Sequence, residues 1–198
     1  MKKTFLLVVA CIFTSIGAQA QNSEVEAFTQ PTKAQQFKEN NSFIKETQLY
    51  RFHVGSSGNL PHLIIDATLF TDLKSGEQVV ALNFTGASVE LDFVGFIGYL
   101  DMDQVDDLIL ALETISSELK NYNKKAPHTI SYTAPGGIDV FATNKDVTFR
   151  KKWLVTNEYG IQSYKYGDSY AIFPAKNIEE VISSIKEAQT IAKQSIGQ

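Results

Sequence analysis

The sequence predicts an α+β fold made of two strand-rich units, each ending in an amphipathic helix, with antiparallel sheets in a tandem ββββα-like order. Three observations predict it. Apolar and polar residues alternate in several short runs, as in strands that bury one face. At two places the spacing of the apolar residues changes to three and four, which is the period of a helix. Clusters of Gly, Ser and Asn, which are typical of turns, separate the runs.

Residues 1–20 have the features of a signal peptide. Two lysines precede a mostly apolar stretch from Phe5 to Ile16, and Ala18-Gln19-Ala20 then supplies the small-x-small pattern of a cleavage site. The apolar stretch is shorter than the about 20 residues of a membrane-spanning helix. We therefore expect cleavage after Ala20 and export to the periplasm or the cell exterior. The alternative is a lipoprotein anchored through Cys11, although apolar residues follow this cysteine where a polar tether is usual.

The predicted mature chain is acidic and contains no cysteine. Of the 198 residues, 178 remain after cleavage, which is enough for one domain or two small ones. Lys plus Arg falls from 18 to 16 against 22 Asp plus Glu, so the net charge becomes −6. Cys11 is the only cysteine, which excludes a disulfide, a thiolate metal site and a cysteine nucleophile from the mature chain.

Two segments make up the first half of the mature chain. Residues 21–42 are polar, and we expect a flexible lead-in with one helical turn near residues 34–38. Residues 43–125 form the first predicted unit. Its strands are indicated by apolar residues with a period of two: Leu63, Ile65, Ala67 and Leu69; Val80, Leu82 and Phe84; Val89, Leu91, Phe93, Ile97 and Tyr99. The helix stripe that follows consists of Val105, Leu108, Ile109, Leu112, Ile115 and Leu119.

Residues 126–198 repeat this order as a second unit. The strand positions are Ile130 and Tyr132; Ile138, Val140 and Ala142; Trp153 and Val155; Tyr164 and Tyr166, and the helix stripe is Ile178, Val181, Ile182 and Ile185. A shift of 73 residues superimposes the halves, for example Ile65 on Ile138 and Val105 on Ile178. Generic patterning is the alternative, but one register across three strands and a helix favours an internal duplication. We expect the two units to form one compact domain together.

This order of strands followed by a helix resembles the whirly and PC4-like folds that bind single-stranded DNA. The resemblance is one of topology only. The two units of about four strands and a helix themselves predict antiparallel sheets with one helix packed on each. A shared fold does not imply a shared function, and no predicted strand here has a basic face. Nucleic-acid affinity depends mainly on clustered cations, so we predict no nucleic-acid partner for this acidic chain.

The chain has no nucleophile-elbow or zinc-helix motif, so its histidines are the remaining candidates for catalytic or metal-binding residues. His53 and His62 flank a predicted turn, and they would face each other across a hairpin if Val54 pairs with Pro61. The nearest carboxylate on the same strand face, Asp66, is about 13 Å from His62 along the strand. We therefore interpret both as surface histidines and predict no metal site and no cofactor.

Four aspartates precede or begin the first predicted helix: Asp101, Asp103, Asp106 and Asp107. Carboxylates at this place favour the positive end of the helix dipole. A calcium loop would need regularly spaced oxygen ligands and a glycine bend. We interpret the cluster as a solvated helix end.

Cations and large aromatic rings coincide on two neighbouring predicted strands of the second unit. Lys151 and Trp153 would share one strand face, and Tyr164 and Tyr166 lie on the following strand. Cations attract anionic groups, and aromatic faces stack on sugars. These four residues are the predicted ligand-binding surface. The alternatives are an edge strand whose lysines hinder aggregation and aromatic rings that pack in the core.

These features favour a non-enzymatic binding or interaction protein of the cell envelope. The expected partner is an envelope glycan, lipopolysaccharide or another envelope protein, and no transmembrane segment is expected in the mature chain. The alternative is a secreted hydrolase whose site is assembled from residues distant in sequence, with His53, His62 or His128 as the general base. A pocket that brings one histidine beside a carboxylate and a Ser or Thr would favour this alternative.

Overall fold

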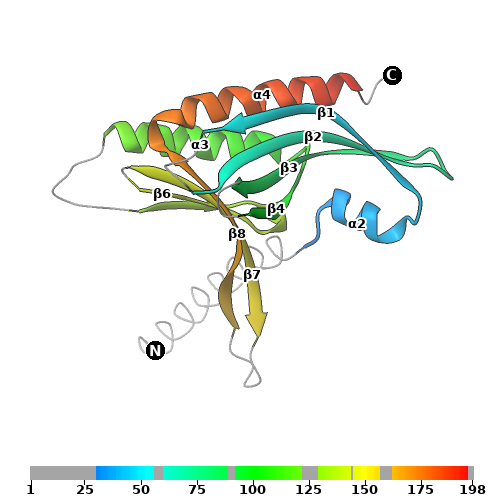
Figure 1. Cartoon of the computed structure of the whole chain (residues 1–198), viewed down its shortest axis with the longest axis horizontal. Helices are drawn as coiled ribbons and strands as arrows, with labels where there is room; N and C mark the ends of the chain where they lie inside the picture. The colour runs from blue at the N-terminus through cyan, green and yellow to red at the C-terminus, as the bar shows by residue number, and fades with distance from the viewer. Residues whose placement is uncertain are drawn as a thin grey trace, which may run out of the picture.

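The computed structural model describes residues 30–55, 60–88, 92–121, 129–143, 145–156 and 162–195. Within these ranges the chain forms two four-stranded antiparallel sheets, each followed by a long helix (Figure 1). Sheet A consists of β1 (Ile44–Val54), β2 (His62–Asp72), β3 (Gln78–Ser88) and β4 (Phe93–Asp101), and α3 (Val105–Lys120) follows it. Sheet B consists of β5 (Ile130–Thr133), β6 (Ile138–Ala142), β7 (Asp146–Thr156) and β8 (Gln162–Pro174), and α4 (Ile178–Ser195) follows it. The predicted α+β class is confirmed.

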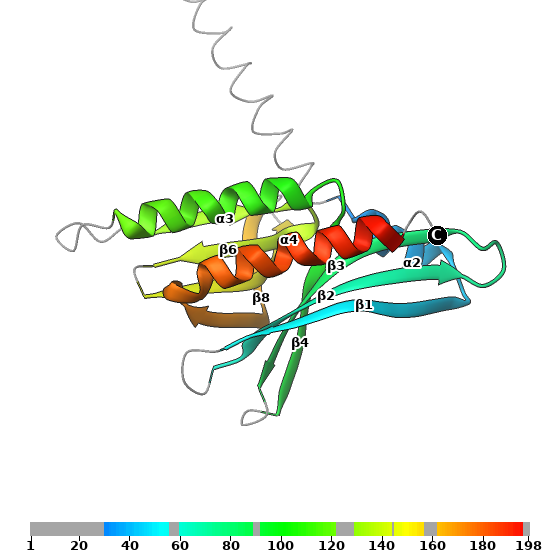
Figure 2. The ribbon, with the colours of Figure 1, turned by 90° about the horizontal axis from the view of Figure 1, so that it is seen from above.

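Each long helix covers the sheet of the other unit. Helix α4 runs along β1 and β2 of sheet A, while α3 lies beside α4 along the strands of sheet B (Figure 2). The Tyr50 hydroxyl on β1 donates a hydrogen bond of 3.0 Å to the Glu187 carboxylate on α4. The two units are therefore interlocked through their helices.

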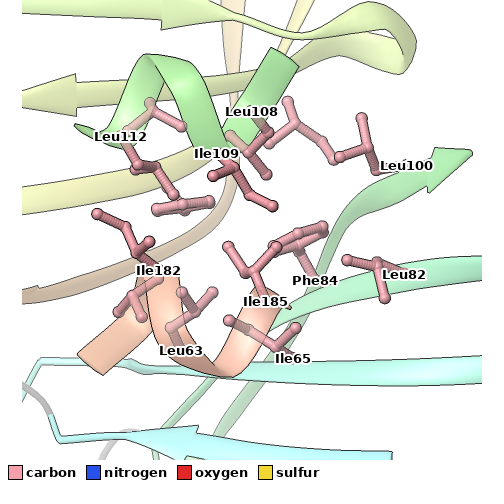
Figure 3. Close-up of a cluster of buried hydrophobic side chains, with 14 of the residues drawn as sticks. Leu63, Ile65, Leu82, Phe84, Leu100, Leu108, Ile109, Leu112, Ile182 and Ile185 are labelled. Carbon is pink, nitrogen blue, oxygen red and sulfur yellow. The ribbon is translucent and has the colours of Figure 1, made fainter. Parts of the chain in front are cut away.

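One hydrophobic core joins the two sheets and both helices (Figure 3). The predicted helix stripes are buried in it: Val105, Leu108, Ile109 and Leu112 on α3, and Ile178, Val181, Ile182 and Ile185 on α4. The rings of Phe84 and Phe149 stack across the sheets with centroids 5.6 Å apart. A Cβ atom on Gly86 would lie 1.9 Å from the Tyr170 carbonyl oxygen, so the close crossing of β3 and β8 requires glycine there.

The 73-residue shift holds where the last strand of each unit leads into its helix. Strand β4 ends at Asp101 and β8 ends at Pro174, and α3 and α4 begin at Val105 and Ile178. The first strands do not follow this register, because a shift of 73 carries β1 to residues 117–127, whereas β5 begins at Ile130 and has 4 residues instead of 11. The shared order of elements is thus a structural fact, while common ancestry of the halves stays a prediction.

The polar lead-in contains more structure than the single expected turn. Helix α2 (Lys33–Asn40) has eight residues and begins with a capping box between Thr32 and Gln35. Its Ala34 and Phe37 are buried against the outer face of sheet A, where Phe70, Ala81 and Tyr99 complete a second, smaller apolar cluster. Two buried side chains and a cap are enough to fix this segment on the sheet.

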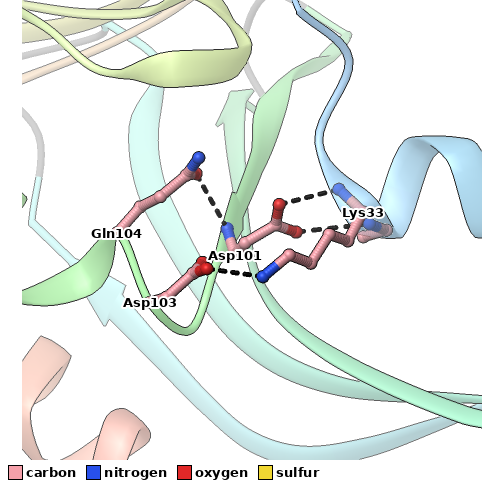
Figure 4. A network of polar contacts seen from close by, with 5 residues as sticks. Lys33, Asp101, Asp103 and Gln104 are labelled. Carbon is pink, nitrogen blue, oxygen red and sulfur yellow. Dashed lines mark hydrogen bonds and ion pairs between the residues drawn. The ribbon is translucent and has the colours of Figure 1, made fainter. Parts of the chain in front are cut away.

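Asp101, the last residue of β4, binds the start of α2 instead of lying at a solvated end of α3, which corrects the interpretation of the acidic cluster (Figure 4). Its buried carboxylate accepts hydrogen bonds from the backbone N–H groups of Lys33 (2.7 Å) and Ala34 (3.2 Å). The Asp103 carboxylate pairs with the Lys33 ammonium. Asp106 and Asp107 remain in the first turn of α3, as expected.

Candidate functional site

His53 and His62 contact each other, but in a register different from the expected one. Val54 pairs with Leu63 instead of Pro61, so the histidines are diagonal neighbours on one face, with ring centroids 5.6 Å apart. Pro61 contacts sheet B instead, because its carbonyl oxygen accepts a hydrogen bond from the Ile172 N–H on β8. Burial, and then the nearby His53, lowers the pKa of His62 below its usual value of 6.5.

The carboxylate considered for these histidines has another partner. Asp66 accepts two hydrogen bonds from the Arg51 guanidinium, of 2.6 and 2.9 Å. In the described ranges, no three side chains of His, Cys, Asp or Glu lie close enough together to hold a metal ion. His128, the third histidine of the hydrolase hypothesis, lies outside the described residues.

The predicted ligand surface is assembled at the level of the backbone. Strand β7 pairs with β8 so that Trp153 lies opposite Lys165, while Tyr164 and Tyr166 lie opposite Leu154 and Lys152. Beyond Lys151, where the pairing with β6 ends, β7 and β8 project from the body as a two-stranded ribbon (Figure 1). The side chains of Trp153, Tyr164 and Tyr166 lie outside the described part of the structure. The ligand surface therefore stays a prediction.

The described cations of this segment are held by the β5–β6 hairpin. The Lys151 ammonium donates a 2.7 Å hydrogen bond to the Gly136 carbonyl oxygen, and burial lowers the pKa of Lys151. Arg150 donates to the Asp139 carboxylate (2.8 Å), which is only 1% exposed. Lys152 donates to the Thr133 hydroxyl (3.0 Å). These contacts show that the three cations contribute to the internal structure of sheet B.

A groove that the sequence did not predict lies between α3 and β5. Its volume is about 410 Å³, and it is lined by Asp107, Leu110, Ala111, Thr114 and Ile115 of α3 and by Ile130, Ser131 and Tyr132 of β5. The pairing of β5 with β6 sets Ile130 opposite Ala142 and Tyr132 opposite Val140, both of which face the core. Ile130 and Tyr132 therefore face α3.

The groove has apolar walls and a few polar groups. Leu110 is 63% exposed, and it lies outside the buried stripe of α3. Burial, with a smaller effect of Asp107, raises the pKa of Tyr132, so this phenol stays protonated at neutral pH. The exposed leucine in an otherwise regular amphipathic helix is the one signal in the sequence that could have indicated this site.

Comparison with known proteins gave no match to a family model, a curated protein or a solved structure. The structure shows the predicted order of four strands followed by a helix in both halves. None of the helices in the described ranges is both long and apolar enough to cross a membrane. Within the described residues, the groove between α3 and β5 is a candidate binding site.

Proposed function

We propose that this protein is an exported, non-enzymatic binding protein of the cell envelope, and that the groove between α3 and β5 is its binding site. The observation that carries the proposal is the exposed Leu110 side chain in a groove with apolar walls. Concave, mostly apolar sites with a few polar groups are typical of binding sites in proteins. The signal peptide predicted at residues 1–20 is the reason to place the protein in the envelope.

The chemistry of the groove favours binding over catalysis. Asp107 and Tyr132 are the titratable residues among those that line it. A raised pKa keeps Tyr132 protonated, so it is a hydrogen-bond donor and a poor base. Of the histidines in the hydrolase hypothesis, His53 and His62 lie on sheet A, whereas the groove lies between α3 and β5, and His128 lies outside the described residues.

Another envelope protein is the partner that fits this groove best. An envelope glycan or lipopolysaccharide would instead suit the predicted surface of Lys151, Trp153, Tyr164 and Tyr166 on the β7–β8 ribbon. Nucleic acid is a poor partner for a mature chain with a net charge of −6.

The test is retention of an envelope component on the immobilised mature protein, with two leucine variants compared. Leu110 and Leu73 are both 63% exposed, but only Leu110 lines the groove. Leu110→Asp should abolish retention, and Leu73→Asp should preserve it. The retained component should elute chemically unchanged. A component that elutes cleaved would favour the hydrolase, and equal loss in both variants would contradict the groove as the site.

Export is tested by fractionating the native host and sequencing the N-terminus of the recovered protein. We expect Gln21 as the first residue in the periplasmic or extracellular fraction. Recovery from the cytoplasm with Met1 intact would contradict export. A lipid-modified Cys11 would favour the lipoprotein alternative.

A further inference from the structure

Strand β5 is an edge strand whose outer side borders the groove. In sheet B the strand order is β5-β6-β7-β8, so the described part of β5 pairs on one side only. An unpaired strand edge offers a row of N–H and C=O groups to another extended chain. Natural sheets often protect such edges with charged side chains or proline, yet the four residues of β5 are Ile, Ser, Tyr and Thr.

The hydrogen-bond pattern of the hairpin identifies the backbone groups that face outward. The Ala134 N–H donates to the Ile138 carbonyl oxygen at 2.7 Å, which makes these two residues a hydrogen-bonded pair. Hydrogen-bonded and non-hydrogen-bonded pairs alternate along an antiparallel ladder. By this alternation Ile130 and Tyr132 bond to β6, whereas the N–H and C=O groups of Ser131 point toward the free edge.

We propose that an extended peptide segment of a partner protein binds here by adding a strand to β5, with alternate side chains inserted in the groove under α3. This inference rests on the proposed binding function and names its partner class. A residue paired with Ser131 would receive both outward backbone groups. The residues on either side of it would point to the face of Ile130 and Tyr132, toward the exposed Leu110. Main-chain bonds would give affinity and the apolar side chains specificity.

Charge favours a partner segment that carries a lysine or arginine. Neighbouring acidic residues of α3 have partners, since Asp106 accepts a hydrogen bond from Gln189 and Glu113 pairs with Lys186. Asp107 lines the groove, and its charge acts on Tyr132, whose pKa it helps to raise. A cation on the peptide would complement this carboxylate. A second copy of this acidic chain is disfavoured because the two copies would repel each other.

The direct test is fluorescence anisotropy with a labelled peptide of alternating valine and threonine that carries one terminal arginine. We expect the mature protein to bind this peptide. The same peptide with N-methyl groups on all of its amides should bind about tenfold more weakly, because neither of its edges can then complete the ladder. Ser131→Pro removes the outward N–H and should have a similar effect, while Ser131→Ala keeps the N–H and should lose less affinity.

A charge exchange tests the role of Asp107 separately. A peptide with glutamate in place of the arginine should bind wild-type protein about threefold more weakly, and Asp107→Asn should remove this preference. Thermal unfolding of each variant verifies that the fold is intact.

Three results would overturn the peptide inference. They are unchanged binding of the N-methylated peptide, unchanged binding by a folded Ser131→Pro protein, and a dimer in light scattering that Ser131→Pro converts to a monomer. The last would identify a second copy as the occupant. If an envelope component is still retained in a Leu110-dependent manner, the binding function stands and only the strand-addition inference fails.

Discussion

Asp139 lies 73 residues after Asp66 and repeats its environment. Each is a buried aspartate on the second strand of its sheet, and each accepts a hydrogen bond from an arginine on a neighbouring strand. The arginines come from different sides, since Arg51 lies on the first strand of sheet A and Arg150 on the third strand of sheet B. Both units thus have a buried carboxylate paired with an arginine, but the arginine comes from a different strand in each unit.

Asp139→Asn should destabilise the protein more than Asp66→Asn. The Arg150 side chain is 23% exposed, against 46% for Arg51, and Lys152 also lies 3.6 Å from the Asp139 carboxylate. The Asp139→Asn change removes the negative charge beside two largely buried cations, Arg150 and Lys152. It should lower the free energy of unfolding by about 3–5 kcal/mol. Water can solvate Arg51 more fully, so Asp66→Asn should lower the free energy of unfolding by less. Urea unfolding of both variants checks the order, and equal losses would contradict it.

Leu108→Ala should lower the free energy of unfolding by about 2–5 kcal/mol, because the truncation leaves a cavity in the shared core. Leu110→Ala on the same helix is the matched control. Its side chain is exposed, and the change should stay within about 0.5 kcal/mol. Chemical denaturation measures both. A small loss for Leu108→Ala would mean that α3 does not contribute to the core as described.

Asp101→Asn should release the start of α2 without unfolding the sheets. The carboxylate binds two backbone N–H groups of this helix, and loss of a helix cap costs about 0.5–2 kcal/mol. Hydrogen exchange of the Lys33 and Ala34 amides should become faster, while amides in β2 should keep their protection. Asp103→Asn should leave exchange nearly unchanged, since both members of its ion pair are exposed.

Acidification through pH 6.5 should destabilise the protein partly through His62. Burial and His53 lower the folded-state pKa of His62, so the unfolded chain takes up a proton first as the pH falls below about 6.5. Stability from this source is complete above that pH and is lost as the pH falls toward the folded pKa. His62→Gln should flatten the curve of melting temperature against pH over this range. A variant curve parallel to that of wild type would exclude His62 as the cause.

Trp153 fluorescence tests the predicted ligand surface on the β7–β8 ribbon. Trp153 is the only tryptophan, so its emission reports on this site alone. If the surface binds an envelope ligand, iodide should quench the emission, and sugars, peptidoglycan fragments or lipopolysaccharide should change it. A blue-shifted emission that none of these affects would place Trp153 in an apolar environment and contradict the site.

The periodic elements could be predicted from the sequence because burial of one face imposes a period on the residues. The stripes of Leu108 and Ile182 are local patterns, so both helices were found. Which sheet each helix covers is not a local property. The stripe shows that a face is buried but does not identify the surface against which it packs. That each helix covers the sheet of the other unit, an exchange of helices between the units, could therefore not be predicted.

Contacts between distant residues explain the other differences. Asp101 lies next to α3 in the sequence, which favoured a local role, but it binds backbone groups 67 and 68 residues away. Helix α2 is polar in composition and is fixed by that same contact together with Phe37. The groove requires α3 and β5 side by side, and only the exposed Leu110 hinted at it.

The exchange of helices also sets a constraint on biosynthesis. A chain is made from its N-terminus, so β1 to β4 are complete long before the 18 residues of α4, which cover them, have been synthesised. Until then Val54, Leu63 and Ile65 have no helix over them. A polypeptide terminated before Ile178 would keep this apolar face open and be prone to aggregation and proteolysis. Loss of the last helix would therefore uncover sheet A, which belongs to the other unit.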